Sequence, residues 1–208
     1  MTIRAVVFDA GNVLELTDDA YDLAEWAAIA GLAPEELTAR IGGVFDGADV
    51  GTVTLAQVHR RLGGALGIGD GQVQAIMENL WRVYLGTPNT GLITWARGLR
   101  PRYKTGILSN SSVGAREREH ARYGYGDLFD DIVYSHEVGL VKPDPRIYAL
   151  CCQRLEVAPA EVAFLDDREV NVAAARAAGL HAVHFRGATP GEATMRAIAE
   201  ITGLLAGL

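Results

Sequence analysis

The stretch Ala5-Val6-Val7-Phe8-Asp9 is a short, uninterrupted apolar run that ends in a carboxylate. Four later stretches of strand length are also largely apolar: residues 105–108, 132–134, 162–165 and 182–185. Continuous apolar strands, in contrast to alternating ones, are typical of a parallel sheet whose two faces are both buried. The five runs therefore predict a parallel β-sheet.

Helix-like segments separate these runs from about residue 90 onward. They span residues 92–99, 115–122, 144–155, 171–178 and 191–205. A regular alternation of strand and helix favours an open, doubly wound α/β sheet. We expect this core to comprise residues 1–16 and 88–208.

The long segment between the first two strands has a helical pattern. Thr54-Leu55-Ala56-Gln57 is a capping box, and Asp70 is expected to cap a second helix with apolar residues at positions 73, 76, 77, 80, 81 and 84. A crossover between parallel strands needs only about a dozen residues, so this segment is too long to be a simple connection. We interpret residues 17–87 as a small all-helical cap subdomain. The alternative is a set of extra helices packed on the core without a role at the site.

Composition and charge exclude several classes of function. The chain has 208 residues, 49% of them hydrophobic, which is enough for a globular core. Its formal charge of −7 predicts no overall attraction to nucleic acid or to anionic membranes. No apolar run approaches the roughly 20 residues of a membrane span, and the N-terminal residues lack the pattern of a signal peptide. Cys151 and Cys152 are adjacent and poorly placed for a structural disulfide. We therefore expect a cytoplasmic protein.

Polar residues follow four of the expected strands, at the point where each strand ends or in the loop beyond it. They are Asp9, Ser109 with Asn110, Lys142, and Asp166 with Asp167. Each alone could be an ordinary cap or turn residue. Ligands of open parallel sheets bind beyond the carboxyl ends of the strands, so together these residues predict a functional site at one edge of the sheet.

The residue types at this edge fit phosphoryl transfer. The carboxylates of Asp9 and Asp167 are hard oxygen ligands of the kind that Mg²⁺ prefers. A carboxylate can also act as a nucleophile and form a covalent acyl-phosphate. Lys142, the Ser109 hydroxyl and backbone N–H groups near Asn110 would hold the phosphoryl oxygens, and Lys142 would keep the carboxylates ionised.

Four motifs in order resemble those of the haloacid dehalogenase-like hydrolase superfamily. They are Val6-Val7-Phe8-Asp9-Ala10-Gly11-Asn12-Val13-Leu14, Ile107-Leu108-Ser109-Asn110, Lys142-Pro143-Asp144-Pro145-Arg146-Ile147-Tyr148 and Phe164-Leu165-Asp166-Asp167. The resemblance implies a Rossmann-like core, a mobile helical lid of the superfamily's first cap type, and an aspartyl-enzyme intermediate on Asp9. It also implies Mg²⁺ on Asp9, the Gly11 carbonyl and Asp167, with Asp166 as their neighbour.

Gly11 departs from the usual phosphatase pattern of this superfamily, in which a second Asp serves as general acid and base. The absence of this second Asp lowers the reaction rate by roughly 10²–10⁴-fold unless another group substitutes for it. Glu15, Asp18 and Asp19 are the nearby candidates, and the last two also fit helix capping.

A branch of sugar-phosphate phosphatases is similar in having Asp-x-Gly-Asn-Val at the first motif. We therefore expect a small phosphorylated metabolite as substrate, such as a sugar phosphate. Its selection is assigned to the cap, where the candidate residues are Phe45, Asp46, Asp49, Trp81 and Tyr84.

Two other functions remain open. A metal-independent 2-haloacid dehalogenase resembles this chain at the first and third motifs, but such enzymes usually replace the acidic pair, so Asp166-Asp167 favours a Mg²⁺ phosphatase. A mutase fits less well, because it depends on the missing acid. A non-catalytic phosphate-binding member of the same fold is the other alternative. The sequence does not predict the oligomeric state.

Overall fold

The computed structural model describes residues 2–17 and 21–207. Five parallel strands form the central sheet in the order β5-β4-β1-β6-β7. The strands are β1 (Ala5–Phe8), β4 (Lys104–Ser109), β5 (Asp131–Tyr134), β6 (Val162–Asp166) and β7 (His181–His184). All five apolar runs are thus confirmed as strands, with differences of one residue at some ends, and the predicted α/β class is confirmed.

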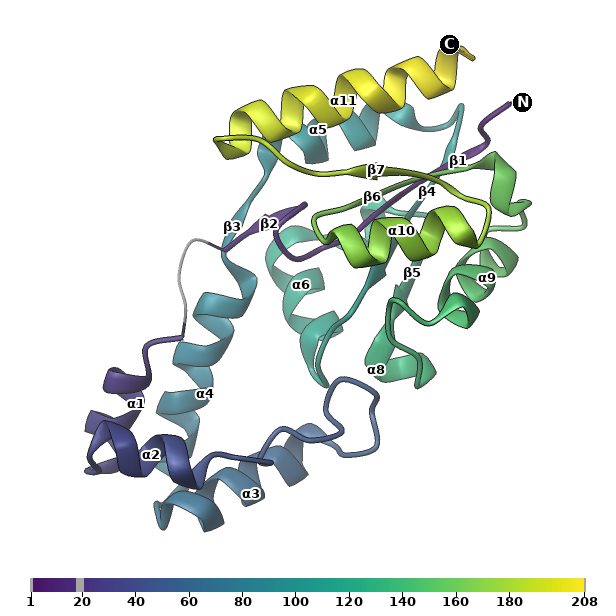
Figure 1. The fold of residues 1–208 in the computed structure, drawn as a ribbon. Coiled ribbons are helices and arrows are strands. Elements are labelled where there is room, and N and C mark those ends of the chain that lie inside the picture. Colours follow the sequence, from purple (N-terminus) through teal and green to yellow (C-terminus); the bar gives the residue numbers. More distant parts are fainter. Residues whose placement is uncertain (1, 18–20, 208) are drawn as a thin grey trace.

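Helices cover both faces of the sheet (Figure 1). On one face lie α5 (Thr90–Leu99) and α11 (Pro190–Ala206), and on the other α9 (Pro145–Arg154) and α10 (Glu169–Ala177). Shorter helical segments follow or precede the strands: α6 (Ala115–Tyr123), α7 (Tyr125–Leu128), α8 (Ser135–Val138) and the 3₁₀ turn Pro159–Glu161. This is the doubly wound arrangement that the alternation predicted.

Strand β1 shows why the apolar runs are continuous. Val6 and Phe8 pack toward α5 and α11, whereas Ala5 and Val7 pack toward α9 and α10. All four side chains are fully buried. Because successive residues of a strand point to opposite faces, a sheet covered on both sides requires apolar residues at every position.

A second apolar core lies among four helices inserted between β2 and β3. They are α1 (Leu23–Ala30), α2 (Pro34–Arg40), α3 (Leu55–Leu66) and α4 (Asp70–Leu85). The capping box at Thr54 is confirmed, since the Gln57 N–H donates to Thr54 Oγ1 at 3.2 Å and the Thr54 N–H donates to Gln57 Oε1 at 2.7 Å. The prediction for Asp70 was wrong by one position: Gly69 is the N-cap, with its N–H donating to Gln72 Oε1, and Asp70 is the first helical residue.

The chain enters and leaves the helical segment through one small antiparallel sheet, formed by β2 (Glu15–Leu16) and β3 (Thr87–Pro88). Asn89 anchors this sheet to the core, because its backbone N–H donates to the Leu14 carbonyl at 2.8 Å and its side-chain amide to the Val13 carbonyl at 2.9 Å. The two connections therefore lie side by side, as a hinge would require.

The loop of residues 41–53, between α2 and α3, contacts the core a second time. Ser135 Oγ donates to the Asp49 carbonyl at 2.7 Å, and the Val113 N–H donates to the Ala48 carbonyl at 3.0 Å. Gly51 has a φ of +68°, and a Cβ there would lie 1.9 Å from the His136 carbonyl oxygen. Only glycine permits this close approach of the loop to α8.

Within the described residues, none of the helices has both the length and the apolar character needed to cross a membrane.

Candidate active site

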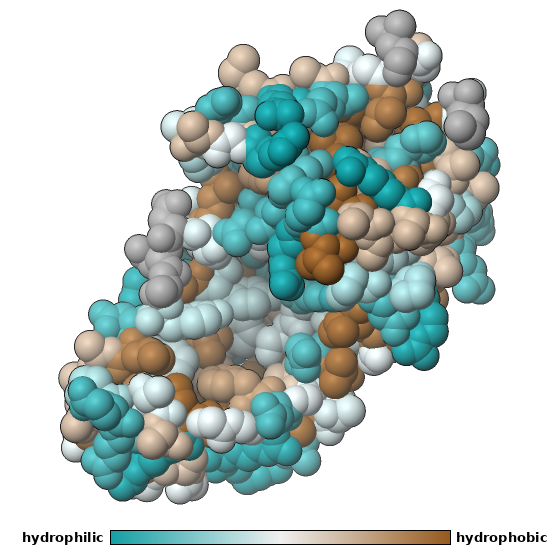
Figure 2. All heavy atoms as spheres, in the orientation of Figure 1, coloured by the Kyte–Doolittle hydropathy of each residue, from teal (hydrophilic) through white to brown (hydrophobic). Residues whose placement is uncertain are grey.

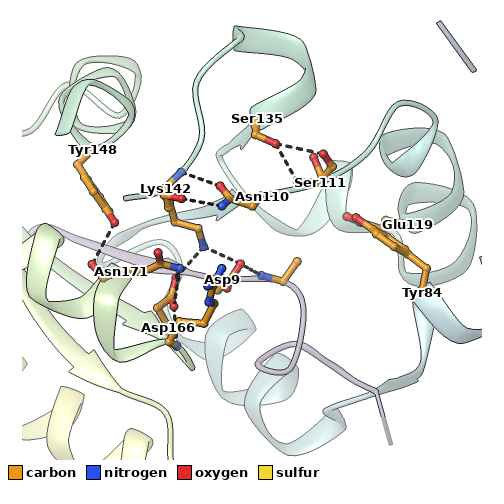
Figure 3. A network of polar contacts seen from close by, with 12 residues as sticks. Asp9, Tyr84, Asn110, Ser111, Glu119, Ser135, Lys142, Tyr148, Asp166 and Asn171 are labelled. Carbon is orange, nitrogen blue, oxygen red and sulfur yellow. Dashed lines mark hydrogen bonds and ion pairs between the residues drawn. The ribbon is translucent and has the colours of Figure 1, made fainter. Parts of the chain in front are cut away.

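The carboxyl ends of β1, β4 and β6 bring the predicted polar residues to one edge of the sheet (Figure 3). Asp9 directly follows β1, which lies between β4 and β6. Its Oδ1 accepts the Ala10 N–H at 2.8 Å and lies 2.8 Å from Lys142 Nζ. No donor from the described residues contacts its other oxygen, Oδ2, and the side chain is 10% exposed. Asp9 therefore has one fixed oxygen and one oxygen free to react.

Lys142 links the carboxylates of the site. Its Nζ lies 2.8 Å from Asp9 Oδ1 and 2.7 Å from Asp166 Oδ2, and its side chain is 1% exposed. Asn110 fixes the backbone of Lys142 in both directions, because Asn110 Oδ1 accepts the Lys142 N–H at 2.8 Å and Asn110 Nδ2 donates to the Lys142 carbonyl at 2.9 Å. The side chain of Asn110 thus positions Lys142.

Asp166 is fully buried, and both of its oxygens are occupied by protein donors. Lys142 contacts Oδ2, and Oδ1 accepts the Arg168 N–H at 2.8 Å. Asn171 Nδ2 lies 3.0 Å from Oδ1 and 3.1 Å from Oδ2. Tyr148 in turn donates to the Asn171 carbonyl at 3.0 Å. Asn171 was not among the predicted site residues, although an amide in the first turn of the helix after Asp166-Asp167 was a usable signal.

Burial and charge perturb the titration of these groups. Burial raises the pKa of Asp9 to about 7, against the lowering effect of Lys142 and with a further contribution from Asp166. Burial alone would lower the pKa of Lys142, but the two carboxylates raise it above its ordinary value. The pKa of Asp167 is also raised, first by burial and then by Asp166. One ammonium therefore compensates only part of the negative charge of three adjacent carboxylates.

The donor set fits a divalent cation such as Mg²⁺. Carboxylate oxygens of Asp9, Asp166 and Asp167 lie within 4.8 Å of one another. Since protein donors occupy Asp166, the oxygens left for a cation are those of Asp9 and the half-buried Asp167. Hard oxygen ligands with an uncompensated charge are the chemistry that Mg²⁺ requires. Gly11, two residues after Asp9, is exposed, and a Cβ on it would meet no atom within 4 Å.

The remaining predicted residues differ in their accessibility. Ser109 ends β4 and is 2% exposed, beside Tyr134 of β5. Glu15 lies in β2, is 1% exposed, and is not one of the carboxylates that cluster with Asp9. Burial and the neighbouring Glu119 carboxylate raise the pKa of Glu15 to about 10. Asp18 and Asp19 lie outside the described residues.

A hollow lies where the helices α1–α4 meet the core, and Figure 2 shows it from the side. The cavity there has a volume of about 460 Å³. Four of the five residues considered for substrate selection line it, namely Phe45, Asp49, Trp81 and Tyr84. Asp46 is not part of the lining, and its carbonyl accepts a hydrogen bond from Arg61 Nη1 at 2.9 Å.

Comparison with known proteins shows that this chain is similar to hydrolases. A family model described as haloacid dehalogenase-like hydrolase matches residues 3–179. Phosphatase MT3486 of Mycobacterium tuberculosis is 29% identical over 188 residues, which cover 88% of this chain and 87% of that protein. (S)-2-haloacid dehalogenase 1 of a Pseudomonas species is 34% identical over 86 residues, covering 40% of this chain and 37% of the dehalogenase.

A solved structure shares the fold over most of its length. It is an enzyme of Bacteroides thetaiotaomicron, described as of the HAD family and crystallised as a magnesium complex. The two structures superimpose with a TM-score of 0.77 at 21% sequence identity, and the match covers 91% of this chain and 96% of that enzyme. At this identity the likeness supports the fold alone.

Proposed function

The chain belongs to the haloacid dehalogenase-like hydrolases, and on that premise we propose that this hydrolase is a Mg²⁺-dependent phosphatase of small phosphorylated metabolites. The observation that carries the proposal is the pairing of Asp9 with Asp167, whose oxygens lie within 4.8 Å of each other beside a lysine that is already bound to Asp9 and Asp166. A metal-independent dehalogenase has no use for this further carboxylate.

The proposed reaction uses Asp9 twice. In the first step Asp9 Oδ2 forms a bond to phosphorus while the bond from phosphorus to the leaving oxygen breaks. In the second step a water oxygen forms a bond to phosphorus, the bond to Oδ2 breaks, and inorganic phosphate leaves. The fixed Oδ1, held by the Ala10 N–H and by Lys142, orients the carboxylate so that Oδ2 faces the substrate.

Lys142 and Ser109 are assigned to the phosphoryl oxygens, and Asn110 and Asp166 to the positioning of Lys142. The ammonium and the hydroxyl supply donors where negative charge is spread over the transferring group. Asp166 fixes the lysine at 2.7 Å from its other side, so the ammonium does not need to reorganise during the reaction.

We assign Mg²⁺ to Asp9, the carbonyl of Gly11 and Asp167, with Asp166 next to them. When bound, the ion would neutralise the charge of these carboxylates and of the phosphoryl oxygens.

Proton supply is the weak point of this site. Gly11 carries no acid, and Glu15 is 1% exposed. We assign the proton of the leaving oxygen to solvent. We therefore expect faster hydrolysis of substrates whose leaving group is a weak base. Sugar phosphates belong to the expected class of small phosphate monoesters, as the first motif suggests.

The helical segment of residues 17–87 is proposed to be the cap that covers this site. Three features support this role: its own apolar core, the paired connections at β2 and β3, and the cavity between it and residues 110–113. We further propose a cytoplasmic location, in keeping with metabolite substrates.

A 2-haloacid dehalogenase is the second candidate. Gly11 favours it, because release of a halide needs no proton, and the Pseudomonas relative carries that activity in its name. In that reaction the aspartate would attack carbon and no phosphate would be involved.

One pair of assays separates the two functions. We expect hydrolysis of p-nitrophenyl phosphate with Mg²⁺ and none after addition of EDTA, because nitrophenolate leaves without a proton. Chloride release from 2-chloropropionate is expected to be absent. Chloride release without phosphatase activity would replace the proposal with dehalogenation, and failure of both would favour a non-catalytic phosphate-binding protein.

A further inference from the structure

We propose that the leaving group of the substrate is uncharged and apolar, and that it occupies the cavity between helices α1–α4 and residues 110–113. This inference rests on the proposed phosphatase activity and narrows its substrate class from small phosphate monoesters in general, sugar phosphates included, to aryl phosphates.

Asn110 connects the cavity to the site of phosphoryl transfer. Asn110 lines the cavity and also binds the backbone of Lys142, whose Nζ lies 2.8 Å from Asp9. Figure 3 shows Asn110, Lys142 and Asp9 close together, with Ser111 and Tyr84 to their right. A group bonded to a phosphate at Asp9 would therefore extend over residues 110–113 into the cavity.

Most of the cavity wall is aromatic or aliphatic. Its lining includes Trp26, Phe45, Leu55, Met77, Leu80 and Trp81. The walls are also held in place: the rings of Trp26 and Phe45 are 6.4 Å apart, and the Arg118 guanidinium lies 4.2 Å from the centroid of the Trp81 ring, joining α4 to α6. Binding of an apolar ligand against such walls is favourable, because it removes apolar surface of both partners from water.

The polar groups of the lining are largely committed to other partners. Tyr84 donates its hydroxyl to Glu119 at 3.3 Å, and Trp26 Nε1 donates to Asn79 Oδ1 at 2.8 Å. Ser111 Oγ lies 2.7 Å from His136 Nδ1. A sugar hydroxyl placed here would lose its hydrogen bonds to water and find few replacements.

Four polar groups of the lining remain, namely the Trp81 indole N–H, Asp49, Ser112 and the exposed Tyr21. The indole N–H of Trp81 is buried and has no acceptor among the described residues, so it offers one hydrogen bond. Asp49 and Ser112 are more accessible, and Asp49 is exposed. The exposed carboxylate of Asp49 disfavours leaving groups that carry a second phosphate or a carboxylate.

The size of the cavity supports an aromatic group. At about 460 Å³ it falls within the range of roughly 300–1,000 Å³ typical of small-molecule sites. Each buried methylene should raise kcat/KM about fourfold until the cavity is filled.

A series of para-substituted phenyl phosphates tests the inference with the leaving-group chemistry held nearly constant. With Mg²⁺, kcat/KM is expected to rise about fourfold per methylene from phenyl through 4-ethylphenyl to 4-butylphenyl phosphate. The 4-(3-hydroxypropyl) analogue should be at least about fivefold poorer than the 4-butyl compound, because its hydroxyl would be buried without a partner. A flat series, or a preference for the hydroxyl or for a 4-(2-aminoethyl) analogue, would overturn the inference.

Matched variants locate the effect. Phe45→Ala, or Leu55→Ala if the first variant does not fold, should reduce the gain per methylene. Leu66→Ala should leave this gain unchanged, because Leu66 is buried in the same helical core but does not line the cavity. An equal loss in all variants would overturn the assignment to the cavity. Hydrolysis of p-nitrophenyl phosphate with a flat series would refute only this inference, whereas no hydrolysis would refute the phosphatase proposal as well.

Discussion

Gly11 offers a direct way to add a general acid two residues after Asp9, a position where this chain has none. The residue is exposed, its φ does not lie in the left-handed region, and a Cβ built on it meets no atom within 4 Å. Gly11→Asp is therefore expected to fold without strain. The carbonyl that we assign to Mg²⁺ is kept, because the substitution changes only the side chain.

The size of the effect depends on the leaving group. The introduced carboxyl would stand two residues from Asp9 and close to its like-charged neighbours, which favours its protonated form. A correctly placed general acid contributes about 10²–10⁴-fold when the leaving oxygen must be protonated. We therefore expect kcat/KM for benzyl phosphate to rise by at least about 10²-fold. The value for p-nitrophenyl phosphate should change little, since nitrophenolate needs no proton.

The assay is phosphate release from both substrates by wild type, Gly11→Asp and the isosteric Gly11→Asn, at saturating Mg²⁺. Only the aspartate variant should gain activity, and only on benzyl phosphate. Equal changes in the two variants would show that shape and not proton transfer is responsible. Equal changes on the two substrates would refute the view that the missing acid limits this enzyme.

Two further substitutions test the buried charges. Lys142→Met leaves Asp9 and Asp166 without their shared cation, and breaking such a buried pair lowers the free energy of unfolding by about 3–5 kcal/mol. Thermal unfolding should therefore occur at a clearly lower temperature. An unchanged melting curve at neutral pH would contradict the buried pairing. Burial raises the pKa of Glu119 to about 7 from an ordinary value of 4.5, so the folded protein retains a proton that the unfolded chain releases. The unfolding free energy should therefore fall as pH rises from 4.5 toward 7, by about 3 kcal/mol at most. Glu119→Gln should weaken this dependence in urea titrations, whereas the exposed Glu117→Gln should keep it in full; the raised pKa values of Glu15 and Asp9 contribute in the same direction and remain in both variants. Identical pH profiles for the two variants would reject the assignment.

The parts of the fold that the sequence predicted are those controlled by local composition. The strands of the core were recognisable because both faces of the sheet are covered, as the opposite packing of Val6 and Val7 shows. The capping box at Thr54 is a local pattern and was also found. The N-cap of α4 was predicted one residue too late, at Asp70. The side chain of Gln72 accepts the Gly69 N–H, so Gly69 is the N-cap.

The parts that escaped prediction depend on contacts between distant segments. The strands β2 and β3 have two residues each, and they form by pairing Glu15 with Pro88 and Leu16 with Thr87, which are far apart in the sequence. The role of Asn110 follows from hydrogen bonds to a backbone 32 residues away. Glu15 looked like a candidate acid, but the fold buries it beside Glu119. No local pattern signals these contacts.

The central claim is that the phosphoryl group passes through Asp9, and trapping it there is the most direct test. The protein is mixed with p-nitrophenyl phosphate and Mg²⁺, quenched in acid during turnover and treated with borohydride, which reduces an aspartyl-phosphate to homoserine. Peptide mass spectrometry should find homoserine at position 9 in the wild type, and none when EDTA is present or when Asp9→Asn is used. Turnover without modification of position 9, or with modification at another carboxylate, would contradict the account.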